Sequence, residues 1–145
     1  MNDTSFGGTL LRGKRKTARP LALRVPLHVV LKSHRQDLHR SARRVEKEIR
    51  FVGGKSVLRL VVHANHVHLI LCFRSRDEWL RFIRLTPARL AKLLGPGLWK
   101  LRPWSRVAAW GFALRRLENY LLRNHQEVEI LRINELLDGV PAPDG

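Results

Sequence analysis

The chain of 145 residues carries 28 Lys or Arg against 12 Asp or Glu, which gives a formal net charge of +16. This length fits one domain, and a hydrophobic content of 44% suffices for a packed core. The excess of positive charge indicates a polyanionic partner, usually nucleic acid. A membrane is disfavoured because the basic residues are spread along the whole chain. The single cysteine, Cys72, excludes an internal disulfide and favours a cytoplasmic protein.

The first 20 residues are basic and rich in turn-forming residues. We expect a flexible tail in which Lys14, Arg15 and Lys16 can contact phosphates. An arm that only aids solubility is the open alternative.

A strand and then a helix are predicted after this tail. Residues 22–32 (ALRVPLHVVLK) read as a strand, in which Pro26 indicates an edge position or a bulge. His28 lies in this strand, and we interpret it as a structural histidine rather than a ligand. Residues 35–51 predict a helix because their apolar residues recur at helical spacing, and a glycine pair ends it.

The middle of the chain predicts two more strands, a second helix and a last strand. Residues 56–73 are dense in β-branched residues and form two antiparallel strands with a break at 63–65. The helix begins at Ser75 as N-cap, and Pro87 kinks or divides it. Residues 98–110 form the last strand, whose tryptophans either stack on bases or belong to the core or a dimer interface.

The last strong helix is predicted over residues 112–126. It carries Tyr120, the only tyrosine, at the border of its apolar stripe, and Asn124 lies one turn further on the same side. A tyrosine in such a place is commonly a packing residue whose hydroxyl reaches water. Residues 127–145 are more acidic and form a predicted tail, with a short helix over 130–137.

These elements give the order β-α-β-β-α-β-α. Four strands with two crossover helices predict an α+β fold of the ferredoxin-like, split βαβ kind, in which helices cover one face of an antiparallel sheet. The final helix is left to pack near the central strands. We therefore expect a tail at residues 1–20, a domain at 21–126 and a second tail at 127–145.

The pair formed by His66 and His68 is the strongest candidate site. Side chains two residues apart on a strand share a face, so the two imidazoles project together while Val67 and Leu69 point the other way. Two adjacent imidazoles can chelate one cation. With seven His in the chain, such a pair arises by chance about one time in three. Two structural histidines at the edge of the core are therefore the open alternative.

Two motifs together resemble a known family. Residues 65–69 (NHVHL) match a form in which two histidines flank a hydrophobic residue, and Tyr120 with Asn124 matches a helical Tyr followed four residues later by Asn or Gln. In these motifs residues 12–126 resemble the single-tyrosine HUH transposases of the insertion-sequence-200-like kind, and most closely their REP-associated branch. The basic tail and the PLHVVL strand add to the resemblance.

The resemblance implies a metal-dependent transposase that cleaves and rejoins single-stranded DNA through a 5′-phosphotyrosine intermediate. Tyr120 is then the nucleophile, and His66, His68 and Asn124 hold Mg²⁺ or Mn²⁺. Gln126 is an alternative third ligand, and Tyr120 can serve the metal of its own chain or that of a partner subunit. The expected partner is single-stranded DNA with a hairpin, in the bacterial cytoplasm at the nucleoid. A homodimer is compatible, and no membrane or nucleotide cofactor is expected.

Basic side chains outside these motifs are candidates for holding DNA. Besides the tail residues Lys14, Arg15 and Lys16, the candidates are Arg43, Arg44, Arg115, Arg116 and Arg123. If several of them neutralise phosphates, the affinity for DNA falls steeply with added salt.

Other functions stay open for the same sequence. One is a non-catalytic protein of this fold that binds single-stranded or hairpin nucleic acid. Another is a hydrolase that uses a metal-activated water at the histidine pair and leaves the tyrosine idle. An RNA-binding ferredoxin-like module is disfavoured because the central strands lack an evident pair of aromatic residues for stacking.

Overall fold

A computed structural model describes residues 23–138. The predicted N-terminal tail, with Lys14, Arg15 and Lys16, lies outside these residues. The described elements are β1 (Leu27–Lys32), a 3-10 turn (Leu38–Ser41), α1 (Ala42–Gly53), a second 3-10 turn (Gly54–Ser56), β2 (Val57–Val62), β3 (His66–Leu71), α2 (Arg76–Leu94), β4 (Trp104–Val107) and α3 (Phe112–Asp138).

The strands form one sheet in the order β2-β3-β1-β4, and every neighbouring pair is antiparallel. The connection through α1 joins β1 to β2, and the connection through α2 joins β3 to β4, so each crossover spans one inserted strand. This is the split βαβ topology, and the predicted α+β, ferredoxin-like fold is confirmed. The strand that carries the histidine pair, β3, is one of the two central strands.

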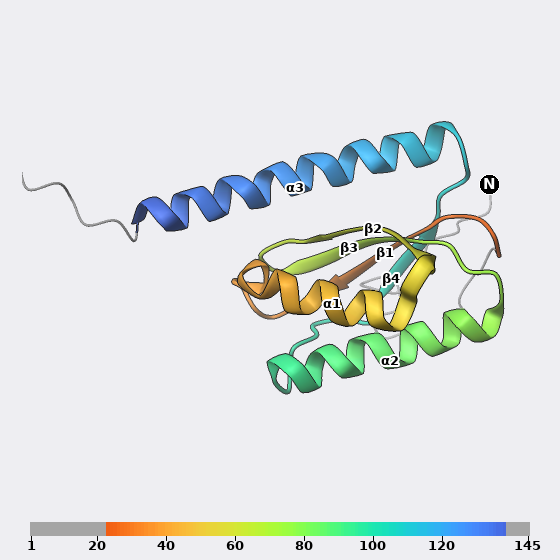
Figure 1. Cartoon of the computed structure of the whole chain (residues 1–145), viewed down its shortest axis with the longest axis horizontal. Helices are drawn as coiled ribbons and strands as arrows, with labels where there is room; N and C mark the ends of the chain where they lie inside the picture. The colour runs from red at the N-terminus through yellow and green to blue at the C-terminus, as the bar shows by residue number, and fades with distance from the viewer. Residues whose placement is uncertain (1–22, 139–145) are drawn as a thin grey trace, which may run out of the picture.

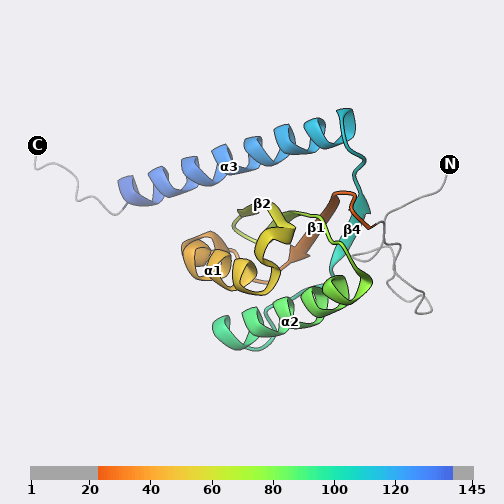
Figure 2. The ribbon, with the colours of Figure 1, turned by 45° about the vertical axis from the view of Figure 1, so that its right-hand side comes forward.

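The helices lie on both sides of this sheet. In Figures 1 and 2, α1 and α2 cover one face while α3 runs along the other. The predicted arrangement, helices on one face plus a separate C-terminal helix, is therefore confirmed. No helix among residues 23–138 has the length and apolar character needed to cross a membrane.

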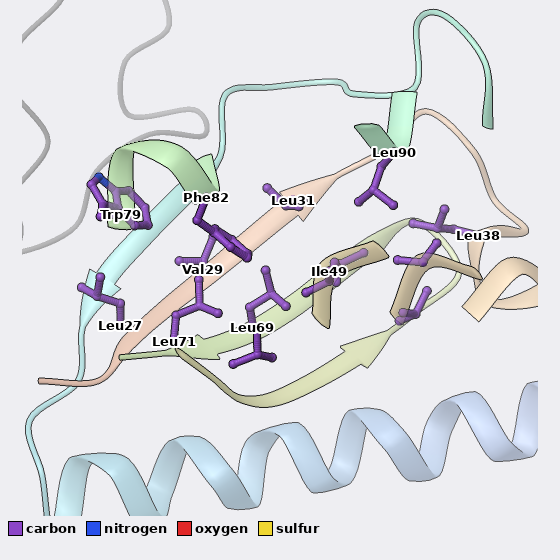
Figure 3. Close-up of a cluster of buried hydrophobic side chains, with 14 of the residues drawn as sticks. Leu27, Val29, Leu31, Leu38, Ile49, Leu69, Leu71, Trp79, Phe82 and Leu90 are labelled. Atoms are coloured by element: carbon purple, nitrogen blue, oxygen red, sulfur yellow. The ribbon is translucent and has the colours of Figure 1, made fainter. Parts of the chain in front are cut away.

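The main core lies between the sheet and the α1–α2 layer. Alternate residues of β1 and β3, including Val29, Val67 and Leu69, point into it and are fully buried. Figure 3 shows Val29 and Leu69 of these strands near Ile49 of α1 and Phe82 of α2. The opposite alternation sends the histidines of β3 to the α3 face, as the sequence predicted.

A smaller apolar cluster attaches α3 to the other face of the sheet. Leu114, Leu121 and Val128 of α3 pack on Val61 of β2 and Ile70 of β3. This second cluster fixes the distance and the rotation of α3 relative to the sheet. It thereby also positions the side chains that lie at the border of the apolar stripe of α3.

Several predicted ends of helices and strands are confirmed, and others differ from the prediction. The break between β2 and β3 falls at residues 63–65, as predicted. The N-cap at Ser75 is confirmed, since the Glu78 N–H donates to its hydroxyl over 3.2 Å. The first strand is shorter than predicted because the chain turns at Arg24, which has a φ of 61°. Helix α2 continues through Pro87 as one element.

The largest difference lies at the C-terminus. Residues 127–138, predicted as part of a tail, continue α3 to Asp138. Polar contacts hold this extension against the domain: Glu127 lies 3.1 Å from His63, and Glu135 lies 2.6 Å from His39. These acidic residues made the segment look like a solvated tail, whereas they face histidines of the domain.

We predict that Leu69→Ala lowers the free energy of unfolding by about 2–5 kcal/mol, because Leu69 is fully buried and a cavity would remain. The matched control is Leu122→Ala, since Leu122 is 55% exposed on α3 and its truncation should cost less than about 1 kcal/mol. Urea unfolding of both variants measures the two values, and equal losses would contradict the placement of the core.

Candidate active site

Three histidines gather on the α3 face of the two central strands. His66 and His68 project from β3, and His28 projects from β1. Because β1 pairs with β3 so that Val30 lies opposite His68, His28 is diagonally next to His68 on the same face. The sequence predicted the first two as a pair but treated His28 as a separate structural residue.

His28 and His68 are in direct contact. Nε2 of His28 lies 3.1 Å from Nδ1 of His68, and the two rings stack with centroids 5.3 Å apart. His68 is 4% exposed. The contact joins residues 40 positions apart, so only the register of β1 on β3 could have revealed it.

His66 lies between the ring of His68 and the β2–β3 turn. Its ring is perpendicular to that of His68, with centroids 4.5 Å apart. Its Nδ1 lies 2.5 Å from the Oδ1 of Asn65. The ring of His63, in the β2–β3 turn, stacks on its other side at 4.7 Å. Neighbours on two sides thus hold the His66 ring beside His68.

Burial keeps these imidazoles neutral. Burial lowers the pKa of His28 to about 4, with the charge of Arg106 acting in the same direction. The pKa of His66 is lowered to about 4 and that of His68 to about 3, again mainly by burial and then by the neighbouring histidines. Neutral imidazoles carry a free lone pair at pH 7, which is the form that binds metal ions.

Tyr120 of α3 faces this histidine group within the same chain. Its ring centroid lies 5.4 Å from that of His68 and 6.4 Å from that of His28, both edge to face. The side chain is 42% exposed, so the phenol combines contact with the histidines and access from solvent. The predicted Tyr120 and His68 are therefore neighbours without a second subunit.

Asn124 lies beneath Tyr120, one turn further along α3. It is 6% exposed and occupies the buried stripe of the helix between Leu121 and Val128. Its Nδ2 donates to the backbone carbonyl of Tyr120 over 2.9 Å. The amide also interacts with the rings of His66 and His68, which counteracts part of the lowering of their pKa values.

Gln126, the alternative third ligand, is exposed and two residues away from this stripe. Of the two candidates, the structure brings only Asn124 to the histidine pair. Its position could be read from the sequence, because Asn124 continues the 3-4 spacing of the apolar stripe as its single polar member.

One nitrogen of the group is buried without a partner. Among residues 23–138, Nε2 of His68 makes no hydrogen bond of good geometry, although the amide of Asn124 interacts with this ring and an unpaired buried polar atom is costly. Within residues 23–138, no group of three or more His, Cys, Asp or Glu side chains is arranged to hold a metal ion. A cation site here would need a ligand of another type, and the amide of Asn124 interacts with both His66 and His68.

A cleft of about 660 Å³ opens in front of these side chains. It is lined by His28, His66, His68 and Tyr120 and, at its rim, by the exposed cations Lys32, Lys100 and Arg102. Trp104 of β4 forms one wall and meets the His28 ring edge to face at 5.1 Å. None of these three rim cations was among the residues predicted to bind DNA.

The predicted arginines lie away from this cleft. Arg43 and Arg44 line a separate hollow of about 680 Å³ between the start of α1 and the end of α3, together with Arg40 and Arg132. The other three, Arg115, Arg116 and Arg123, are exposed on α3 and do not line the cleft.

Comparisons with known proteins add little to this geometry. No family model matches the chain, and no curated protein matches it. Among solved structures, it is similar to one described as "a putative transposase" from Deinococcus radiodurans R1, at 14% identity and a TM-score of 0.46. The match covers 77% of this chain and 98% of that one. A likeness at this level carries no argument about activity, so function is inferred from the cleft.

We predict that the metal-free protein loses stability as the pH falls from 7 to 5. The unfolded chain binds protons at histidines with an ordinary pKa near 6.5, whereas His28, His66 and His68 stay neutral when folded. Protonation therefore favours the unfolded state in this range, where most carboxylates remain charged.

Urea unfolding in EDTA at several pH values measures this dependence. In a His68→Gln variant the slope should be smaller, because one of the neutral buried imidazoles is removed. An unfolding free energy that is equal at pH 7 and pH 5 would contradict the burial of these rings.

Proposed function

We propose that this protein cleaves and rejoins single-stranded DNA through a covalent bond between Tyr120 and a 5′-phosphate, as a transposase does. The observation that carries the proposal is the position of Tyr120, whose ring lies 5.4 Å from that of His68 in a cleft rimmed by cations. A phenol, two neutral imidazoles and a rim of cations thus lie together in one chain, which supports the proposal.

The residues of the cleft floor fit a divalent cation. Within residues 23–138, the buried Nε2 of His68 makes no hydrogen bond of good geometry, and the amide of Asn124 interacts with the same ring. With His66 and Asn124 it would form a set of three neutral ligands, suited to Mn²⁺ and acceptable to Mg²⁺ with water in the remaining positions. When bound, such an ion supplies a positive charge that polarises the scissile phosphate.

The side chains of the protein account for the remaining steps. Lys32, Lys100 and Arg102 lie at the rim, where they can hold the DNA backbone without blocking the phenol. A phenol is a weak nucleophile until it loses its proton. The oxygen of Tyr120 then bonds to phosphorus, the bond from phosphorus to the 3′ oxygen breaks, and that oxygen takes up one proton.

The covalent product retains the energy of the phosphodiester bond. A 3′-hydroxyl of another DNA end can attack the phosphotyrosine, which re-forms a DNA strand and returns the proton to Tyr120. The sequence of bond changes is balanced without ATP, and it explains why one tyrosine and one cation site are sufficient for both cleavage and joining.

We predict that Tyr120→Phe abolishes a covalent protein–DNA adduct that the wild-type protein forms. Both proteins are incubated with labelled hairpin oligonucleotides carrying randomised single-stranded flanks and Mn²⁺, and the products are separated on a denaturing gel. Wild-type protein in EDTA provides the metal-free control. The substitution removes only the hydroxyl of an exposed side chain, so the fold and DNA binding should persist.

Other results of this adduct assay would support one of the alternative functions. Cleavage by the Tyr120→Phe variant without an adduct would assign the reaction to a metal-activated water. Hairpin binding by the wild-type protein with neither cleavage nor adduct would assign it to a non-catalytic binder of nucleic acid.

We predict that Asn124→Ala weakens Mn²⁺ binding by at least about tenfold, because it removes the buried amide beside the two imidazoles. The matched control is Gln126→Ala, which changes an exposed amide two residues away and should leave the affinity unchanged. Isothermal titration calorimetry measures both variants, and the reverse order of effects would transfer the ligand role to Gln126.

A further inference from the structure

The contact between His28 and His68 has a role of its own. The proposed ligand set uses Nε2 of His68, whereas Nδ1 of the same ring lies 3.1 Å from Nε2 of His28. A hydrogen bond at one nitrogen of an imidazole decides which nitrogen carries the proton, and thus which one offers a lone pair. His28 is therefore positioned to determine which ring nitrogen of His68 carries the proton.

Between Nε2 of His28 and Nδ1 of His68 there is room for one hydrogen, so one of the two nitrogens donates it and the other accepts it. If His28 donates it, His68 carries its own proton on Nε2, and that N–H removes the lone pair that a cation needs. If His68 donates from Nδ1, its Nε2 holds a lone pair that points away from His28. Only the second arrangement makes His68 a ligand.

We propose that His28 is a positioning residue that accepts the Nδ1 proton of His68 and so holds Nε2 of His68 in the cation-binding form. This inference rests on the proposed function, because it assigns a role towards the same cation. A metal-binding imidazole commonly gives its other N–H to a carboxylate or a backbone carbonyl. Here the acceptor is a second imidazole.

The surroundings of His28 fit an acceptor held in one orientation. Its ring stacks on His68 with an interplanar angle of 21°, and Trp104 meets its edge at 5.1 Å. Both strands that carry the pair are central, and their register fixes the diagonal spacing of the two rings. The pair is thus set by the sheet backbone rather than by a mobile loop.

The choice of histidine as acceptor has an electrostatic consequence. A carboxylate at this position would bring a negative charge next to the ligand and repel the phosphate backbone of the substrate. A neutral imidazole accepts the same hydrogen without adding charge. The positive charge of a bound cation therefore remains available to the phosphate.

The test compares two substitutions at one position. His28→Phe keeps a ring of similar shape but removes the acceptor, and it should weaken Mn²⁺ binding by about 10- to 100-fold. In His28→Gln the side-chain amide oxygen reaches about as far as Nε2 did, so the affinity should return to within a few-fold of wild type. The control His125→Phe alters an exposed histidine on α3 and should change nothing.

A second measurement locates the proton of the His68 ring directly. Long-range ¹H–¹⁵N correlation spectra of the wild-type protein with Mg²⁺ should show His68 protonated at Nδ1. In His28→Phe, this preference should be lost, and thermal unfolding confirms that the variant is folded. A purely structural role for His28 would change the unfolding temperature but not the position of the His68 proton.

Two results would overturn the inference. One is His68 protonated at Nε2 in the wild-type protein. The other is a folded His28→Phe variant that binds Mn²⁺ as wild type does. If the wild-type protein still forms the Tyr120 adduct in either case, the proposed function stands and only the role of His28 falls. If the wild-type protein neither binds Mn²⁺ nor forms the adduct, both proposals fall together.

Discussion

The pairing of β1 with β3 is the constraint on which the rest of the structure depends. Its register sets Val30 opposite His68, and a shift by one residue would turn every side chain of a strand to the other face of the sheet. Such a shift is costly because Val29, Val67 and Leu69 are fully buried against α1 and α2. The apolar face of the two strands therefore fixes where their histidines stand on the opposite face. The same strand pairing therefore places both the core residues and the histidines of the site.

The phenol is placed by a helix that docks over most of its length. Leu121 and Val128 pack on the sheet on either side of the buried Asn124, and the acidic residues Glu127 and Glu135 contact histidines of the domain. A helix attached at several points cannot roll about its axis without losing some of these contacts. Tyr120 is at the border of the attached face, so it is held at a fixed distance from His68 and still reaches solvent. The C-terminal half of α3 thus contributes to the site although it does not line the cleft.

Local patterns in the sequence predicted the elements and part of the site. The strand break at residues 63–65 and the N-cap at Ser75 depend on a few neighbouring residues, and both were found where expected. The His pair on one strand face follows from the pleat alone. The partner of His68 could not be predicted in this way, because His28 lies 40 residues away and only the register of two strands joins them. The length of α3 was missed for a similar reason, since Glu135 finds its partners in the tertiary structure.

The distribution of charge in the cleft relates these features to a substrate. Exposed cations such as Lys32 and Lys100 stand at the rim, whereas the floor consists of buried or half-buried imidazoles whose lowered pKa values keep them neutral. A floor of protonated histidines would repel a cation, and a floor of carboxylates would bind a cation but cancel its charge and repel a phosphate. A neutral floor beneath a positive rim avoids both effects. Since the phenol opens onto the same space, the arrangement suits a phosphodiester that approaches from solvent and meets the rim cations before Tyr120. The proposed substrate, a single strand, is more flexible than a duplex and can bend its backbone into such a cleft.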